Sequence, residues 1–308
     1  MQTLSPLRYP GGKAKLANFV HDLIITNRLS DGHYVEPYAG GASVAMSLLI
    51  NEYVSHVHLN DLDRSIFAFW HSVLNDTDAL CHRIKTATLS ISAWRRQRAV
   101  QASPRKSSLL QLGFSTFYLN RTNRSGIINS AGIIGGVAQE GKWKLDARFY
   151  RETLIRRIQT IAAYRDRITL SNLDAEAFLK RLIPRLPSKT LIYLDPPYYV
   201  KGKRRLYANH YEHPDHAHIA ALLANCKLPW IVSYDNVAQV RRLYCGYRYL
   251  RYGLQYSAQR RYEGSEVMFF GHNLALPLPR KTGARMGQKP FPPAASQLSE
   301  NKEPFRAD

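Results

Sequence analysis

The tetrapeptide Asp195-Pro196-Pro197-Tyr198 places a carboxylate, free carbonyls and an aromatic ring directly after the apolar run 190–194. An amino group on an aromatic base is a poor nucleophile because its lone pair is delocalised into the ring. Acceptors that hold its N–H bonds favour a pyramidal nitrogen, and the Asp195 carboxylate and the Pro196 carbonyl are such acceptors. Tyr198 offers a face for stacking, a contact worth about 1–3 kcal/mol. The alternative interpretation is an Asp-Pro-Pro turn that only closes a strand.

A glycine-containing turn is the second candidate, and it follows the strand-like segment HYVEP. Gly40 and Gly41 allow a ligand to approach the backbone closely, and the amides of the next helix would point at it. Asp61, at the end of the following predicted strand, is placed to accept a hydrogen bond from a ribose hydroxyl. A strict G-x-G-x-x-G motif is absent, so an ordinary tight turn with an exposed acid is the alternative.

The segment RYPGGK, Arg8 to Lys13, does not match a phosphate-binding P-loop. Leu7 stands where that pattern requires its first glycine, and Ala14 replaces the Ser or Thr that would hold Mg²⁺. Two interpretations stay open: a flexible basic turn, or a loop that brings Lys13 to a ligand carboxylate.

Histidines and cysteines do not predict a metal site. The segment NHYEHPDHAH is rich in histidine, but Pro214 and Asp215 indicate a helix start, and a helix places His216 and His218 on different faces. The three cysteines, Cys81, Cys226 and Cys245, lack C-x-x-C spacing, which argues against both a disulfide framework and a zinc ribbon. We expect reduced, structural cysteines and no bound metal.

These candidate residues require an α/β sheet to position them. From Tyr34 to Asp61 the pattern is strand, small-residue turn, helix and strand, which is typical of a βαβ unit. The alternation breaks between 62 and about 148, where helical stretches and a Gly-rich segment predict an insert, and it returns with RITLSN, TLIYL and PWIVSY. Beyond Asn273 the Pro-rich sequence predicts a disordered tail.

Composition favours a nucleic-acid partner. The 308 residues carry a formal net charge of +20, distributed as −3 over residues 1–80, +15 over 81–189 and +8 over 190–308. A surplus confined to one segment is more typical of a phosphate-binding surface than of a charge that only keeps the protein soluble. The N-terminus lacks an apolar leader, and no run approaches the roughly 18 apolar residues of a membrane span, so we expect a cytoplasmic protein with no membrane partner.

With these motifs in place, the sequence resembles the Dam-like family of adenine-specific DNA methyltransferases over roughly residues 4–272. The resemblance is carried by six motifs in family order, which are LRYPGGK, YVEPYAGGASV, NDLD, YLNRTNRSG, ITLSNLDAEAF and DPPYY. It implies a Rossmann-like S-adenosylmethionine-dependent methyltransferase sheet domain with an inserted, mostly helical DNA-recognition domain. The catalytic domain would comprise 1–62 and 149–274, the recognition insert 63–148, and the disordered tail 275–308.

The resemblance also implies residue roles. Asp195, Pro196, Pro197 and Tyr198 would form the catalytic loop that holds a flipped adenine. S-adenosylmethionine would contact Tyr9, Lys13, Glu36, Pro37, Tyr38, Ala39, Gly40 and Gly41, with Asp61 on its ribose and Asp174 on its adenine. Asn120 and Arg121 would fall in a hairpin that enters DNA, with Arg124 a candidate for reading guanine.

Two departures from the family matter: Tyr9 stands where a tryptophan is known, and the loop after Arg121 differs, which leaves the recognition sequence open. We expect a monomer of bacterial or phage origin that acts on double-stranded DNA, and a companion restriction endonuclease would be compatible. The alternatives are the same fold acting on cytosine amino groups, RNA bases or protein glutamine amides, or a DNA-binding module without catalysis. Asp195 in place of Asn argues against the glutamine reaction.

Overall fold

The chain folds around one mixed sheet. The computed structural model describes residues 4–8, 16–199, 211–255, 263–277 and 285–287. Within them, the strand order is β3-β2-β1-β4-β5-β7-β6-β8. The strands are β1 His33–Glu36, β2 His56–Asn60, β3 Ile168–Ser171, β4 Thr190–Leu194, β5 Trp230–Asp235, β6 Arg248–Gln255, β7 Glu263–Phe270 and β8 Arg285–Gly287. The α/β fold class predicted from the sequence is confirmed.

The first five strands form a parallel sheet whose order reverses at its centre. From the centre of the sheet, β1, β2 and β3 follow one another toward one edge, and β4 and β5 follow one another toward the other edge. At the centre β1 pairs with β4, and Val35 lies opposite Ile192. Strand β7 pairs antiparallel with β5 and with β6. In open α/β sheets, the carboxyl ends of the two strands at such a reversal form the usual ligand crevice. The fold therefore places the loops after β1 and β4 side by side.

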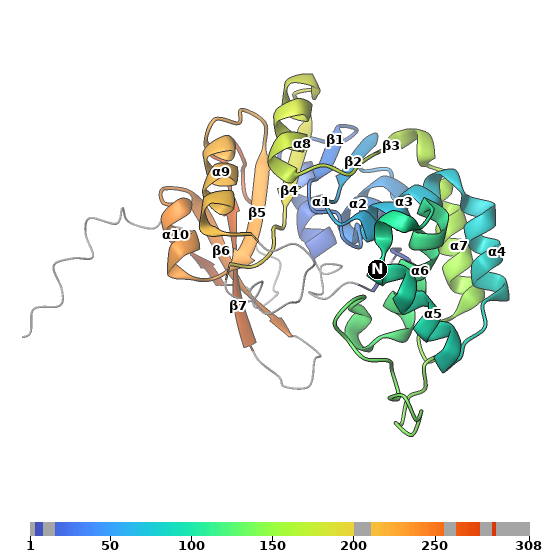
Figure 1. Cartoon of the computed structure of the whole chain (residues 1–308). Coiled ribbons are helices and arrows are strands. Elements are labelled where there is room, and N and C mark those ends of the chain that lie inside the picture. The colour runs from blue at the N-terminus through green and yellow to red at the C-terminus, as the bar shows by residue number, and fades with distance from the viewer. Residues whose placement is uncertain (1–3, 9–15, 200–210, 256–262, 278–284, 288–308) are drawn as a thin grey trace, which may run out of the picture.

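Helices cover both faces of the sheet (Figure 1). They are α1 Leu16–Thr26, α2 Ser43–Ile50, α3 Arg64–Asn75, α4 Thr77–Thr86, α5 Ile91–Ala102, α6 Leu109–Thr122, α7 Arg151–Ala162, α8 Ala175–Leu182, α9 His213–Ala224 and α10 Ala238–Leu243. Successive residues of β4 alternate between two cores: Leu191 and Tyr193 pack with α1, α2 and α3, whereas Ile192 and Leu194 pack with α8, α9 and α10. Burial on both faces explains why the strand is a continuous apolar run.

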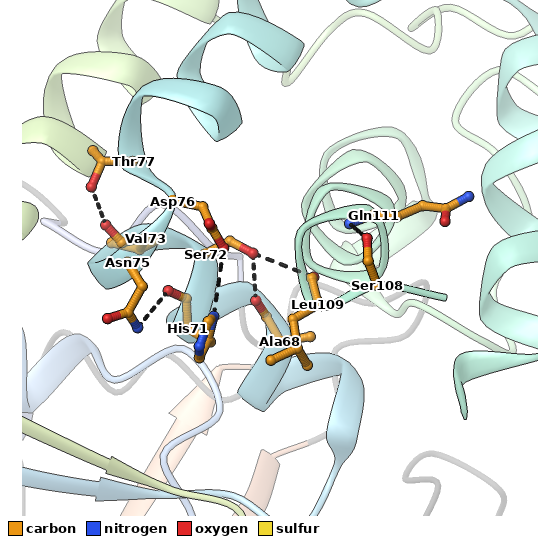
Figure 2. Close-up of polar contacts among 10 residues, drawn as sticks. All are labelled: Ala68, His71, Ser72, Val73, Asn75, Asp76, Thr77, Ser108, Leu109 and Gln111. Atoms are coloured by element: carbon orange, nitrogen blue, oxygen red, sulfur yellow. Dashed lines mark hydrogen bonds and ion pairs between the residues drawn. The ribbon is translucent and has the colours of Figure 1, made fainter. Parts of the chain in front are cut away.

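Helices α3 to α7 gather at one flank of the sheet, away from α9 and α10 (Figure 1). Figure 2 shows how α3 meets the start of α6: the Ser72 hydroxyl lies 2.8 Å from the Ala68 carbonyl oxygen and 3.3 Å from that of Leu109. A Cβ atom on Gly113 would lie 2.5 Å from the Ala68 oxygen, so only glycine permits this approach of the two helices. The helical segment is thereby fixed to the chain that leaves β2.

The core is continuous between the sheet and these helices, since Phe69 and Trp70 of α3 and Phe117 of α6 share a cluster with Leu59 of β2. The predicted boundaries at residues 62 and 149 fall just before α3 and just before α7. The division into a catalytic domain and a recognition insert stays a prediction.

The segment predicted as a disordered tail contains some ordered residues. Ala275 donates its backbone N–H to Asn27 Oδ1 at 2.7 Å, and Leu276 packs against the core. Strand β8 pairs antiparallel with β6 through Met286 and Leu250. Residues 278–284 and 288–308 lie outside the described residues, so the prediction for them stays untested.

The described residues contain no helix that is both long and apolar enough to span a membrane. They also contain no group of three or more His, Cys, Asp or Glu side chains that could hold a metal ion. The predicted helix start at Pro214 is confirmed, since α9 opens with a capping box between Glu212 and Asp215. His216 is buried in this helix, whereas the exposed His218 faces Glu176 at 3.5 Å.

Candidate active site at the sheet reversal

The turn after β1 has the conformation expected of a close-approach loop. Gly40 has φ +47° and Ala42, the N-cap of α2, has φ +44°, a left-handed conformation that is unusual for a residue with a Cβ. Glu36 is buried, and its Oε1 accepts hydrogen bonds from the Tyr34 hydroxyl at 3.0 Å and from the Ala45 amide at 3.2 Å. A carboxylate beside the N-terminal amides of α2 fixes the helix relative to the strand.

Asp61, the residue after β2, hydrogen-bonds to this turn. Its Oδ2 accepts from the Gly40 amide at 2.8 Å and its Oδ1 from the Asp63 amide at 2.9 Å. Burial, with a smaller contribution from the nearby Asp63 charge, raises the pKa of Asp61 to about 7. A carboxyl group with this pKa is poised between its two protonation states near neutral pH.

The Asp195 carboxylate is held by a chain of hydroxyl groups from two strands. Ser233 of β5 donates its hydroxyl proton to Asp195 Oδ1 at 2.7 Å, and Tyr193 of β4 lies 3.1 Å from Ser233 Oγ. Because the hydroxyl of Ser233 has one proton and an ionised carboxylate can only accept, the Tyr193 hydroxyl must be the donor to Ser233. The sheet thus fixes the direction of the Asp195 side chain.

The tyrosines after the two prolines are also anchored. Tyr198 is 8% exposed and donates its hydroxyl proton to Glu266 of β7. Tyr199 donates its backbone N–H to Asp235 Oδ1 at 2.9 Å. The loop 195–199 is therefore attached to β5 and β7 as well as to β4.

A tyrosine cluster joins this region to α8 and α9. The Tyr38 hydroxyl donates to that of Tyr211 at 3.1 Å, and burial, followed by the charge of the nearby Asp174, raises the pKa of Tyr211. Asp174 caps α8, since its Oδ1 accepts from the Glu176 amide at 2.9 Å. The structure thus brings Asp174 and the turn after β1 together.

The residues predicted to contact DNA differ in exposure. Asn120 and Arg121 lie in the last turn of α6, 1% and 6% exposed, whereas the sequence prediction placed them in a hairpin. That prediction of local structure was wrong because burial keeps the chain helical through these polar residues: every residue from Leu112 to Thr122 is buried. A hairpin-like loop follows instead, closed by a bridge between Asn123 and Ile133.

Arg124 is exposed in this loop, consistent with a surface role. Asn120 and Arg121 instead bond to backbone atoms near the N-terminus. The DNA contacts predicted for all three residues stay predictions. Tyr9 and Lys13 lie outside the described residues.

Several positioning residues were missed by sequence reasoning. Ser233 and Glu266 hydrogen-bond to the loop 195–199, and Tyr193 bonds to Ser233. Trp70 of α3 donates its indole N–H to the Gly40 carbonyl at 2.9 Å. Asn60 of β2 joins three segments, donating to the carbonyls of Pro37 at 3.0 Å and Leu173 at 2.9 Å. Polar residues at buried strand positions are the signal that could have found Asn60 and Ser233.

A family model matches most of this chain. The family model of the D12 class N6 adenine-specific DNA methyltransferases matches residues 9–258. A comparison with curated proteins found no match.

Among solved structures, the chain is similar to the rRNA methyltransferase aviRa from Streptomyces viridochromogenes, with 14% identity, a TM-score of 0.38, and coverage of 86% of this chain and 88% of that one. It is also similar to a conserved hypothetical protein of Streptococcus pyogenes, with 13% identity, a TM-score of 0.31, and coverage of 79% and 88%.

Proposed function

The chain belongs to the family of D12 class N6 adenine-specific DNA methyltransferases, and from this premise we propose that it transfers the methyl group of S-adenosylmethionine to the exocyclic amino group of an adenine in duplex DNA. The observation that carries the proposal is the position of Asp195, which follows β4 and so lies beside the glycine turn that follows β1. A donor held by one loop and an acceptor held by the other would meet at the sheet reversal.

The residues of the first loop fit a nucleoside cofactor. The turn from Glu36 to Gly41 offers backbone groups, and Asp61 would accept a hydrogen bond from a ribose hydroxyl through its carboxylate. Asp174, and Tyr9 and Lys13 from outside the described residues, complete the proposed contacts. When bound, S-adenosylmethionine supplies an electrophilic methyl group on a sulfonium.

The residues of the second loop would prepare the acceptor. Asp195, held by Ser233, and the carbonyl of Pro196 would accept the two N–H bonds of the adenine amine and direct its lone pair toward the donor. Tyr198 would contact the ring of the base. Such positioning of two reactants supplies much of the rate in a reaction that needs no covalent intermediate.

The helical flank, formed by helices α3 to α7 and their connections, has a surface that favours double-stranded DNA as the methyl acceptor. Three of the large hydrophobic side chains exposed among the described residues lie between 137 and 150, and they are Val137, Trp143 and Tyr150. Lys142 and Arg148 each lie over the Trp143 ring, 5.9 and 6.0 Å from its centroid. Cations beside an exposed aromatic ring suit phosphates and unstacked bases. The target base would have to leave the duplex, at a cost of a few kcal/mol.

The proposal covers a monomeric cytoplasmic enzyme, with or without a companion restriction endonuclease. The test is transfer of labelled methyl from S-adenosylmethionine to unmethylated duplex DNA, with the modified nucleoside identified and the modified sites sequenced. We expect N6-methyladenine at one short motif. Label in cytosine, in RNA or in protein, offered in parallel, would instead assign the same fold to another acceptor.

Asp195→Ala provides the matched control. It should abolish methyl transfer while leaving duplex binding within a few-fold, because Asp195 faces the reacting amine and the basic flank holds the phosphates. Turnover retained by Asp195→Ala would contradict the role given to this carboxylate.

A further inference from the structure

Residues 4–8, which we call the N-terminal strap, cross from the glycine turn to the helical flank. The Ser5 hydroxyl donates to the carbonyl oxygen of Gly41 at 2.5 Å. Ser5 is 1% and Leu7 3% exposed, and Leu7 belongs to the main core cluster. One end of the strap is therefore attached to the turn proposed to hold the cofactor.

The other end of the strap is held by Asn120 of α6. Asn120 Oδ1 accepts from the Arg8 amide at 2.7 Å, and Nδ2 donates to the Arg8 carbonyl at 2.7 Å. Both backbone groups of Arg8 are thus bound by one side chain. The Arg121 guanidinium donates to the neighbouring Pro6 carbonyl, which fixes the strap along the helix.

The same Asn120 amide also holds the loop that follows α6. Its Nδ2 donates a second hydrogen bond to the Gly126 carbonyl at 2.8 Å. Gly126 has φ +76°, and a Cβ atom there would lie 2.5 Å from the Arg8 carbonyl oxygen. The strap and the loop are therefore in direct contact, with Asn120 as the side chain that bonds to both.

The loop from 123 to 133, which we call the recognition loop, is internally ordered. The Arg124 amide donates to the Gly132 carbonyl at 3.0 Å. Asn123 Nδ2 donates to the carbonyls of Ile127 and Ile128, each at 2.9 Å. Asn123 Oδ1 accepts from the Trp94 indole of α5 at 2.7 Å, which holds the start of the loop to that helix. The part of the loop beyond Asn123 can therefore shift as a unit about this fixed start when its attachment to the strap changes.

We propose that Asn120 is a positioning residue that couples occupancy of the cofactor turn to the placement of the recognition loop, so that cofactor and DNA bind cooperatively. The proposal rests on the proposed function. Cofactor contacts at the glycine turn favour one position of the strap. Because Asn120 bonds to both Arg8 and Gly126, that position of the strap also affects where Gly126 lies. A ligand that favours this position of the strap thereby favours the loop placement that the second ligand contacts.

A direct base contact by Asn120 is the competing explanation. All three hydrogen bonds of its amide go to the protein, and the side chain is 1% exposed. To reach a base, Asn120 would have to give up these bonds and leave the Arg8 and Gly126 groups without them. The geometry therefore favours positioning over contact.

The test measures the dissociation constant of a duplex that contains the methylation motif, with and without saturating S-adenosylhomocysteine. In the wild-type chain the ratio of the two constants should lie at about 5–150, the usual size of such coupling. Asn120→Ala should reduce this ratio to near 1 while the affinity for S-adenosylhomocysteine alone stays within about threefold. Arg124→Ala is the matched control: it should weaken duplex binding and leave the ratio unchanged.

A second readout does not depend on DNA. Hydrogen exchange of the amides in 123–133 should slow when S-adenosylhomocysteine binds the wild-type chain, and should not respond in Asn120→Ala. If Asn120→Ala does not fold, Ser5→Ala interrupts the strap at its other end and should abolish the same response. A ratio near 1 in the wild type, or one that Asn120→Ala leaves intact, would overturn the proposal. A chain that binds S-adenosylhomocysteine and protects the loop but ignores DNA would instead count against the proposed function alone.

Discussion

Ser233 fixes the direction of the carboxylate on which the proposed chemistry depends. It donates to Asp195 and accepts from Tyr193, and it is 1% exposed. Ser233→Ala should lower kcat by up to about 10²-fold, because misplacing a reacting group by around 1 Å has that cost. The KM for S-adenosylmethionine should change little, as measured in steady-state methyl transfer, and Ser233→Thr should restore much of the rate. An unchanged kcat in Ser233→Ala would show that Asp195 needs no such support.

The raised pKa of Asp61 predicts a pH dependence of cofactor affinity. Burial and Asp63 raise its pKa to about 7, and the proposed ribose contact requires the carboxylate form. Since about a tenth of the group is ionised at pH 6 and about nine tenths at pH 8, the affinity for S-adenosylhomocysteine should rise about tenfold over that range. Titration calorimetry at pH 6, 7 and 8 measures this. Asp61→Asn should bind more weakly and without pH dependence, and a pH-independent wild type would contradict the assignment.

At the scale of elements, three histidines lie at and near the start of β1 and β2. His33 Nδ1 lies 3.0 Å from His58 Nε2, and the His56 and His58 ring centroids are 4.7 Å apart. Burial, then the charges of His56 and His33, lower the pKa of His58 to about 3, and burial also lowers the pKa of His33 and of His56. The folded protein therefore favours the neutral form of these three imidazoles.

This cluster predicts loss of stability in acid. The unfolded chain binds a proton at His58 near pH 6.5 and the folded chain does not, so the stability is complete above pH 6.5 and falls as the pH drops toward 3. His58 contributes up to about 1.4 kcal/mol for each pH unit of that fall. Urea unfolding of the wild type and His58→Gln between pH 5 and 7 isolates this contribution from Asp61, whose raised pKa acts in the opposite direction. Parallel pH dependence in the two proteins would contradict the prediction.

Sequence patterns predicted correctly those elements whose residue types agree with the environment that the fold gives them. The apolar runs at 190–194 and 230–235 are confirmed as buried parallel strands, and the Pro214 helix start is confirmed. The end of α6 was mispredicted because burial against the strap overrides the turn-like sequence Asn-Arg-Thr-Asn-Arg-Ser-Gly. Helix α1 and strand β6 were not predicted at all.

The candidate site was predictable where chemistry is local. Asp195 and the glycine turn are recognisable from a few consecutive residues. Their supports are not, because Ser233 is 38 residues from Asp195 and Glu266 is 68 residues from Tyr198. Such pairs are set by strand order, which a single sequence does not reveal.

Over the whole molecule, the charge of the helical flank should govern DNA binding. Lys142 and Lys144 are exposed in this basic third of the chain. The double variant Lys142→Ala and Lys144→Ala should reduce the slope of log affinity against log salt by about 2, one for each phosphate that the variant no longer neutralises. Lys180→Ala is the control, because Lys180 is paired with Glu176 on α8 and should leave the slope unchanged. Equal slopes in all three proteins would place the phosphate-binding residues elsewhere.

The C-terminal segment should contribute to stability. Ending the chain at Leu274 removes the Ala275 bond to Asn27, the packing of Leu276 and strand β8. Tm should fall by about 2–4 °C for each kcal/mol that these interactions contribute. Ending the chain at Gly287 keeps all three and is the comparison, with both proteins measured by calorimetry. If the shorter protein melts at the same temperature, residues 275–287 do not stabilise the fold.

The N-terminal strap also constrains the order in which the nascent chain can fold. Its partner Asn120 lies 112 residues beyond Arg8, and Arg157, which donates to the Ser5 carbonyl at 3.3 Å, lies 152 residues beyond Ser5. The strap is therefore synthesised well before these two partners, although Gly41, which Ser5 also contacts, follows it after only 36 residues. Because contacts at large separations form late, docking of the strap on α6 and α7 is a late step in folding.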